Sequence, residues 1–129
     1  MLDAPYVMKM AQSLARHAGA RQAQVARNIA NADVPGYRAR DVVEFSKTYQ
    51  QTKTGADVKT TRAGHIQHAS SQSAFETFAL RNEAAPNGNT VSVEQEMVRG
   101  TDAKSSHDLA LAVYKSSLDV LRTSLGKGR

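Results

Sequence analysis

The sequence predicts a mainly α protein, in which long N- and C-terminal helices pair as a coiled-coil-like layer and the middle is extended, partly β or irregular. Three observations carry this prediction: an apolar stripe of helical period at each end, a Pro-Gly turn after the first stripe, and a long polar stretch between the two. We expect a discontinuous helical inner domain over residues 1–33 and 91–126, and an extended, turn-rich middle segment over residues 34–90.

The first helix is expected from about residue 6 to residue 31. Pro5 suits its first turn, and no acidic residue stands between Asp3 and Asp33, so the helix is basic. Its apolar stripe follows a 3.6-residue period and consists of Val7, Met10, Leu14, Ala18, Val25, Ile29 and Ala32.

A firm break is expected after this helix. Val34 precedes a proline and is therefore pushed out of the α region. Pro35 and Gly36 suit the two central positions of a type II turn, because glycine accepts a positive φ. Asn31 and Asp33 can cap the C-terminal end of the helix by hydrogen bonding to nearby backbone groups.

The middle of the chain is mostly polar and could not pack a core alone. Residues 38–45 are expected to be extended or a short strand, and residues 56–62 are the best strand candidate beyond them. Residues 86–89, Pro-Asn-Gly-Asn, are a strong turn signal. One small apolar patch is formed by Phe75, Phe78 and Leu80.

A second long helix follows this turn. Ser92 and Gln95 fit a capping box, and Glu94 and Glu96 favour the positive end of the helix. An apolar heptad seam follows, in which the spacing alternates between three and four residues: Leu111, Tyr114, Leu118, Leu121 and Leu125. A second apolar flank, formed by Leu109, Val113 and Val120, indicates more than one neighbour.

The composition favours association over an independent core. Of the 129 residues, 5 % are aromatic and none is tryptophan, and alanine makes up much of the 40 % hydrophobic fraction. Because alanine buries little apolar area, the hydrophobic driving force per residue is low. We therefore expect self-association to supply burial that the monomer lacks.

No enzymatic activity is expected. The absence of cysteine excludes thiolate catalysis, disulfides and zinc–thiolate sites. His65 and His68 stand three residues apart, but Gly64 disfavours a helix there and no third ligand is near, so no metal site is predicted. No phosphate-binding loop or nucleophile elbow is present. We predict no catalytic, cofactor-binding or metal-binding residue.

Two further classes of function stay open on the residues alone. The net charge of +5 suits a basic binder of nucleic acid or membrane. No nucleic-acid-binding motif is present, however, and the first helix is too rich in alanine to bind a membrane strongly. The other class is an independent helical adaptor. No run of about 18 apolar residues and no signal peptide is found, so we expect neither membrane insertion nor export by a cleaved signal.

The break itself resembles the signature of the bacterial flagellar axial proteins, the rod and hook family, which carry it after an N-terminal helix. It stands here as Asn28-Ile29-Ala30-Asn31-Ala-Asp-Val-Pro35-Gly36-Tyr37, with valine in place of the usual threonine before proline. Within this family, the chain most resembles the proteins of the proximal rod, because it is short and because Arg38-Ala-Arg-Asp41 follows the motif. Residues 61–66 and 87–97 are similar to further segments of such proteins.

The resemblance implies a structural subunit of the flagellar basal-body proximal rod, the periplasmic drive shaft for motility, which self-assembles helically. It implies as partners copies of the chain, other flagellar rod proteins, the rod adaptor and the flagellar type III export apparatus, with no nucleic acid and no cofactor. The turn would fix the angle at which the chain leaves the helical layer. The assembly seam would comprise Val7, Met10, Leu14, Val25, Ile29, Leu111, Tyr114, Leu118, Leu121 and Leu125.

Overall fold

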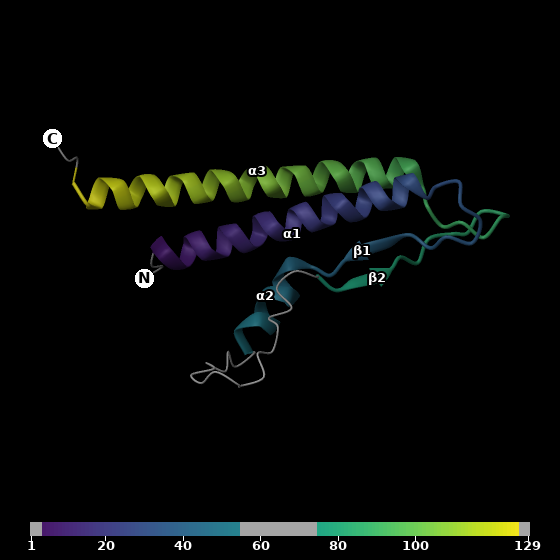
Figure 1. Cartoon of the computed structure of the whole chain (residues 1–129), viewed down its shortest axis with the longest axis horizontal. Coiled ribbons are helices and arrows are strands. Elements are labelled where there is room, and N and C mark those ends of the chain that lie inside the picture. The colour runs from purple at the N-terminus through teal and green to yellow at the C-terminus, as the bar shows by residue number, and fades with distance from the viewer. Residues whose placement is uncertain (1–3, 55–74, 127–129) are drawn as a thin grey trace, which may run out of the picture.

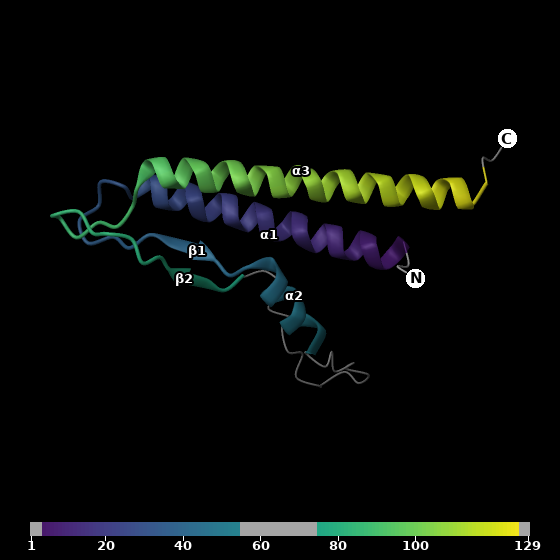
Figure 2. The same cartoon turned by 180° about the vertical axis from the view of Figure 1, so that it is seen from behind.

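Two long antiparallel helices make up more than half of the residues that the structure describes (Figure 1). The computed structural model describes residues 4–54 and 75–126. Helix α1 spans Ala4–Ala30 and helix α3 spans Val93–Ser124, and the two lie side by side (Figure 2). The mainly α fold with paired terminal helices is therefore confirmed.

A narrow two-stranded sheet runs beside α1. Strand β1 (Arg40–Val42) pairs antiparallel with β2 (Thr77–Ala79), and Asp41 stands opposite Phe78. We call residues 34–43 the outgoing segment and residues 75–92 the return segment, because the chain leaves α1 along the first and reaches α3 along the second (Figure 1). The predicted strand at 56–62 and the histidine pair at 65 and 68 lie outside the described residues.

A short helix that the sequence analysis did not predict follows β1. Helix α2 (Phe45–Thr54) begins where extended chain was expected to end. Phe45 and Tyr49 stand four residues apart and stack with ring centroids 5.4 Å apart, and such a pair stabilises one face of a helix. Because this stretch is mostly polar, the pair was not recognised in the sequence as a signal for a helix.

Small side chains form the contact between α1 and α3. The buried apolar residues here are Ala11, Ala18 and Val25 on α1, and Ala103 and Ala110 on α3. We call these five residues the alanine interface. A Cβ placed on Gly100 of α3 would lie 3.5 Å from Cγ1 of Val25, so the two backbones approach closely here. A buried methylene group stabilises by about 0.8 kcal/mol and a buried leucine by about 1.5–3 kcal/mol, so this interface is weak for its length.

The start of α3 is capped largely as expected. The Ser92 hydroxyl accepts a hydrogen bond from the backbone N–H of Gln95 at 3.5 Å, and Glu94 and Glu96 stand in the first turn. Glu94 is exposed, whereas Glu96 is fully buried. The two acids thus have different environments, although the sequence suggests the same role for both.

Candidate functional site

The predicted turn after α1 is present. Gly36 has a φ of 74° and stands third in the four-residue turn from Val34 to Tyr37. The backbone N–H of Tyr37 closes the turn by donating to the carbonyl oxygen of Val34 at 3.3 Å. Asn31 caps the helix as expected, since its side-chain amide donates to the carbonyl oxygen of Arg27 at 2.7 Å.

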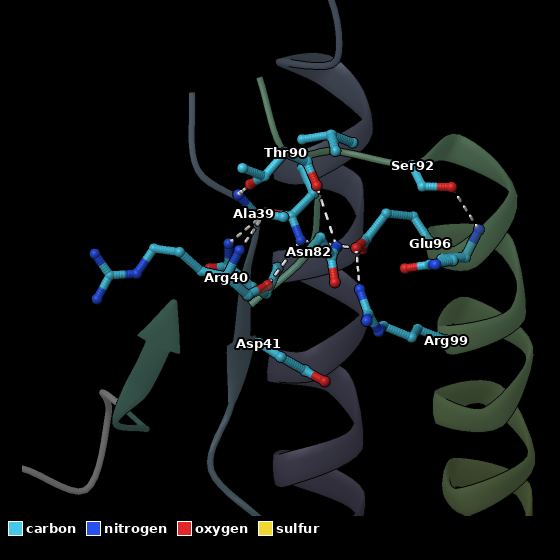
Figure 3. A network of polar contacts seen from close by, with 12 residues as sticks. Ala39, Arg40, Asp41, Asn82, Thr90, Ser92, Glu96 and Arg99 are labelled. Atoms are coloured by element: carbon cyan, nitrogen blue, oxygen red, sulfur yellow. Dashed lines mark hydrogen bonds and ion pairs between the residues drawn. The ribbon is translucent and has the colours of Figure 1, made fainter. Parts of the chain in front are cut away.

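The return segment holds this turn in place. The N–H of Gly36 donates to the carbonyl oxygen of Asn87 at 3.0 Å, and the N–H of Thr90 donates to that of Tyr37 at 3.0 Å. The hydroxyl of Thr90 also accepts from the N–H of Ala39 at 2.9 Å (Figure 3). The geometry of the break therefore depends on residues far along the chain, and not on Pro35 and Gly36 alone.

Asn89 supplies a second cap for α1 that the sequence analysis missed. Its side chain is buried, and its amide lies 3.0, 2.8 and 2.7 Å from the carbonyl oxygens of Asn31, Ala32 and Val34. Carbonyl groups at a helix C-terminus have no partner within the helix, and here one distant side chain serves three carbonyls in and after that region. The Pro-Asn-Gly-Asn sequence indicated only a turn at this place.

Asn28, the first residue of the family motif, is completely buried where α1, α3 and the outgoing segment meet. Its amide nitrogen donates to the carbonyl oxygen of Arg40 at 2.7 Å and to the carboxylate of Glu96 at 3.0 Å. Its carbonyl oxygen accepts from the Gln24 amide at 3.1 Å, the Tyr37 hydroxyl at 3.2 Å and the N–H of Arg40 at 3.2 Å. One side chain thus joins three parts of the chain.

Glu96 completes this polar junction from α3. Its side chain is fully buried, and Figure 3 shows it between the two helices with Arg99 beside it. One carboxylate oxygen accepts from Arg99 at 2.6 Å and the other from Asn28. Among the described residues, no buried side-chain nitrogen or oxygen is left without a hydrogen bond. The missed signal is the spacing of Glu96 from Ala103 and Ala110, which places all three at one heptad position.

Two further contacts fasten the outgoing segment along α1. The Arg21 guanidinium donates two hydrogen bonds of 3.1 Å to the buried carboxylate of Asp41, in a bidentate ion pair. Nε2 of His17 lies 2.7 Å from the carbonyl oxygen of Val43, and its ring has edge contacts with Phe45 and Phe75. Neither contact of Arg21 or His17 was predicted from the sequence.

The residues of the expected assembly seam divide into covered and exposed groups within the single chain. Val25 is buried, and Val7, Met10, Leu14, Leu118 and Leu121 are half-buried. Ile29, Leu111, Tyr114 and Leu125 are exposed, with 86 % of Leu125 accessible. Within the chain α3 presents mainly its alanines to α1, and several of its bulky side chains stay outside.

The exposed bulky residues of α3 lie on two sides of the helix. The first flank consists of Val93, Met97, Leu111, Tyr114 and the C-cap residue Leu125, and the second flank consists of Val98, Leu109 and Val120. At 3.6 residues per turn the two flanks lie roughly 170° apart around the axis. Exposed apolar surface of this kind marks a site of association when its residues are contiguous.

These features define a class of protein, a two-helix protein with bulky apolar side chains exposed on two sides of its C-terminal helix. Within the described residues no group of three or more potential metal ligands is present. No family model matches the chain. The chain is 30 % identical to the flagellar basal body rod protein FlgB of Salmonella typhimurium over 117 residues, which cover 84 % of each protein. It is 29 % identical to FlgB of Agrobacterium fabrum and 28 % identical to FlgB of Escherichia coli, over 85 % and 84 % of each protein.

The chain belongs to the family of the flagellar basal body rod protein FlgB. It is accordingly a structural protein of the flagellar basal body rod and not an enzyme. In the described part of the chain, neither long helix has a stretch apolar enough to cross a membrane.

Proposed function

We propose that this chain builds the rod by helical self-assembly, with α1 and α3 in the inner layer of the proximal rod. Membership of the rod protein family supports the general function. The observation that carries the mode of assembly is the exposure of bulky apolar side chains on both flanks of α3, while alanines occupy its contact with α1.

Each flank would pack against a different neighbour. Leu109 is 60 % exposed on the second flank, and Leu111 is 51 % exposed on the first. Full burial of a leucine side chain stabilises by about 1.5–3 kcal/mol, so a few such contacts would exceed what the alanine interface supplies. Contacts between unlike surfaces that do not close into a ring generate an open helical assembly.

The family motif would have a positioning role in this assembly. Asn28, Tyr37 and the turn at Gly36 fix the course of the outgoing segment relative to the helices. A fixed course would present β1, β2 and α2 to neighbouring subunits at the same angle in every copy. In this proposal Pro35 and Gly36 act through backbone geometry and have no chemical role.

The further partners and the route to the rod belong to the same proposal. We expect contacts with other rod proteins and the rod adaptor, and passage through the flagellar type III export apparatus to the periplasmic rod without a cleaved signal. A helix pair held by small side chains and one polar junction is suited to export in the unfolded state, because little packing has to be broken.

Substitution on a flank tests the mode of assembly. Leu111→Asp would place a charge in a contact from which water is excluded, at about 3–5 kcal/mol for an unpaired charge. We expect this variant to be made normally but to be missing from isolated basal bodies, in cells that lack the natural protein. Ala112→Asp is the matched control, since Ala112 is the next residue, is exposed and lies between the two flanks. Normal recovery of Leu111→Asp in basal bodies would refute the assignment of the first flank.

A further inference from the structure

We infer that the buried contact of Asn28 with Glu96 and Arg99 sets the register in which α3 packs against α1. This register is a property of the single chain and does not depend on the proposed mode of rod assembly. The helix contact has two parts, an apolar part whose alanines repeat along each helix and a polar part that occurs once among the described residues.

The alanine interface repeats at heptad intervals. Ala11, Ala18 and Val25 are each seven residues apart on α1, and Ala103 and Ala110 are seven apart on α3. A slide of one heptad moves one helix by about 10 Å along the other. The slide would place His107 opposite Val25, where Gly100 now allows a close approach, and Ala103 opposite Asn28. The close approach at Gly100 and the polar contact of Glu96 therefore both favour the observed register, and the repeat of alanines alone does not set it.

The connection between the helices also opposes such a slide. The side chain of Asn89 binds the end of α1, and Thr90 binds Tyr37 and Ala39. Only two residues separate Thr90 from the start of α3, so a slide of α3 towards and beyond the end of α1 would strain or break these contacts. The contribution of the polar contact is therefore measured by removing Glu96 while the return segment is left unchanged.

The polar contact has only one register in which its groups are paired. Glu96 has the heptad position of Ala103 and Ala110, but its carboxylate is buried and bound to Asn28 and Arg99. After the slide Ala103 would face Asn28, whose amide would lose an acceptor in a buried place. A buried polar group without a partner disfavours a state by about tenfold or more. A single buried polar residue in an apolar helix contact is known to specify register in this way.

Engineered disulfides can report the register, because the chain contains no cysteine. Val25→Cys with Gly100→Cys reports the observed register, since a Cβ on Gly100 would lie 3.5 Å from the Val25 side chain. Val25→Cys with His107→Cys reports the slide, since position 107 is one heptad further along α3. Both pairs are oxidised in the dilute full chain, and monomeric cross-linked product is measured on non-reducing gels.

We expect the parent chain to form the 25–100 disulfide and little of the 25–107 disulfide. Glu96→Ala should raise the yield of 25–107 relative to 25–100 by about tenfold or more. Glu94→Ala is the matched control, because it removes an exposed acid from the same helical turn, and it should leave the ratio unchanged.

A second variant keeps the test decisive if Glu96→Ala loses its helical circular dichroism. Glu96→Leu fills a similar volume with an apolar group, so it avoids the cavity that Glu96→Ala leaves between the helices. The same rise in the 25–107 product is expected. An unchanged ratio in helical Glu96→Ala or Glu96→Leu would overturn the inference, because the alanine interface or the return segment would then be setting the register.

Discussion

Replacement of Gly36 by valine should block incorporation of the subunit through backbone strain. Gly36 has a φ of 74°, and a Cβ built on it would meet no atom within 4 Å. A Cβ at this position therefore has open space, and the expected cost comes from the left-handed backbone, at about 1–2 kcal/mol for an L-residue. Relief of that strain by a change of φ would disturb two hydrogen bonds, from Gly36 to Asn87 and from Tyr37 to Val34.

The assay is recovery of Gly36→Val in isolated basal bodies, together with the free energy of unfolding of the purified chain. Gly126→Val is the matched control: Gly126 has a φ of 80° and no atom within 4 Å of a built Cβ, but it follows α3 and directs no segment between helices. We expect similar local strain in both variants and a loss of incorporation only for Gly36→Val. Val34→Thr should be silent, since both residues are β-branched and Val34 is exposed. Parent-like incorporation of Gly36→Val would show that the break is a flexible joint.

Two further predictions concern the isolated chain. Asn89→Ala should lower the free energy of unfolding by about 1–3 kcal/mol, because carbonyl oxygens at the end of α1 lose a buried donor. Chemical denaturation measures this free energy. A loss below about 0.5 kcal/mol, which is the scale of surface substitutions, would contradict the assigned cap. Amide hydrogen exchange should be slowest in α1 around Asn28 and fastest towards Ala4, because helices gain most of their stability from packing and the polar junction lies at the Asn28 end. Uniformly strong protection along α1 in a dilute monomer would contradict this gradient.

The sequence was most informative where a pattern is local. The stripe through Val7, Leu14 and Val25 predicts α1, and Pro35 followed by Gly36 predicts a turn with a positive φ. Ser92 and Gln95 predict the start of α3. In each case the residues that carry the signal are the ones that adopt the geometry, so propensity and structure agree.

Long-range polar pairing could not be predicted in the same way. Nothing in the neighbourhood of Asn89 shows that it caps a helix ending near residue 30, and Glu96 has the appearance of an ordinary charge in a first helical turn. The pairing of Arg21 with Asp41 likewise depends on how β1 lies against α1. Such partners become visible only when the fold brings distant segments together, although the heptad spacing of Glu96 from Ala103 gave a partial signal.

The leucine pattern of α3 shows a different limit of periodicity. Heptad spacing at Leu111, Leu118 and Leu125 indicates an interface without naming the partner. Within the chain α1 faces Ala103 and Ala110, while Leu111 and Leu125 remain exposed. A pattern that specifies contact in an assembly and a pattern that specifies contact within the monomer look the same in a sequence.

A reconstruction of the assembled rod that resolves side chains tests the central claim most directly. The account predicts that α1 and α3 of each subunit keep their alanine interface, and that neighbouring subunits cover both flanks of α3, with Leu109 and Leu111 buried against different copies or different rod proteins. A rod in which Leu109 and Leu111 still face water would contradict it.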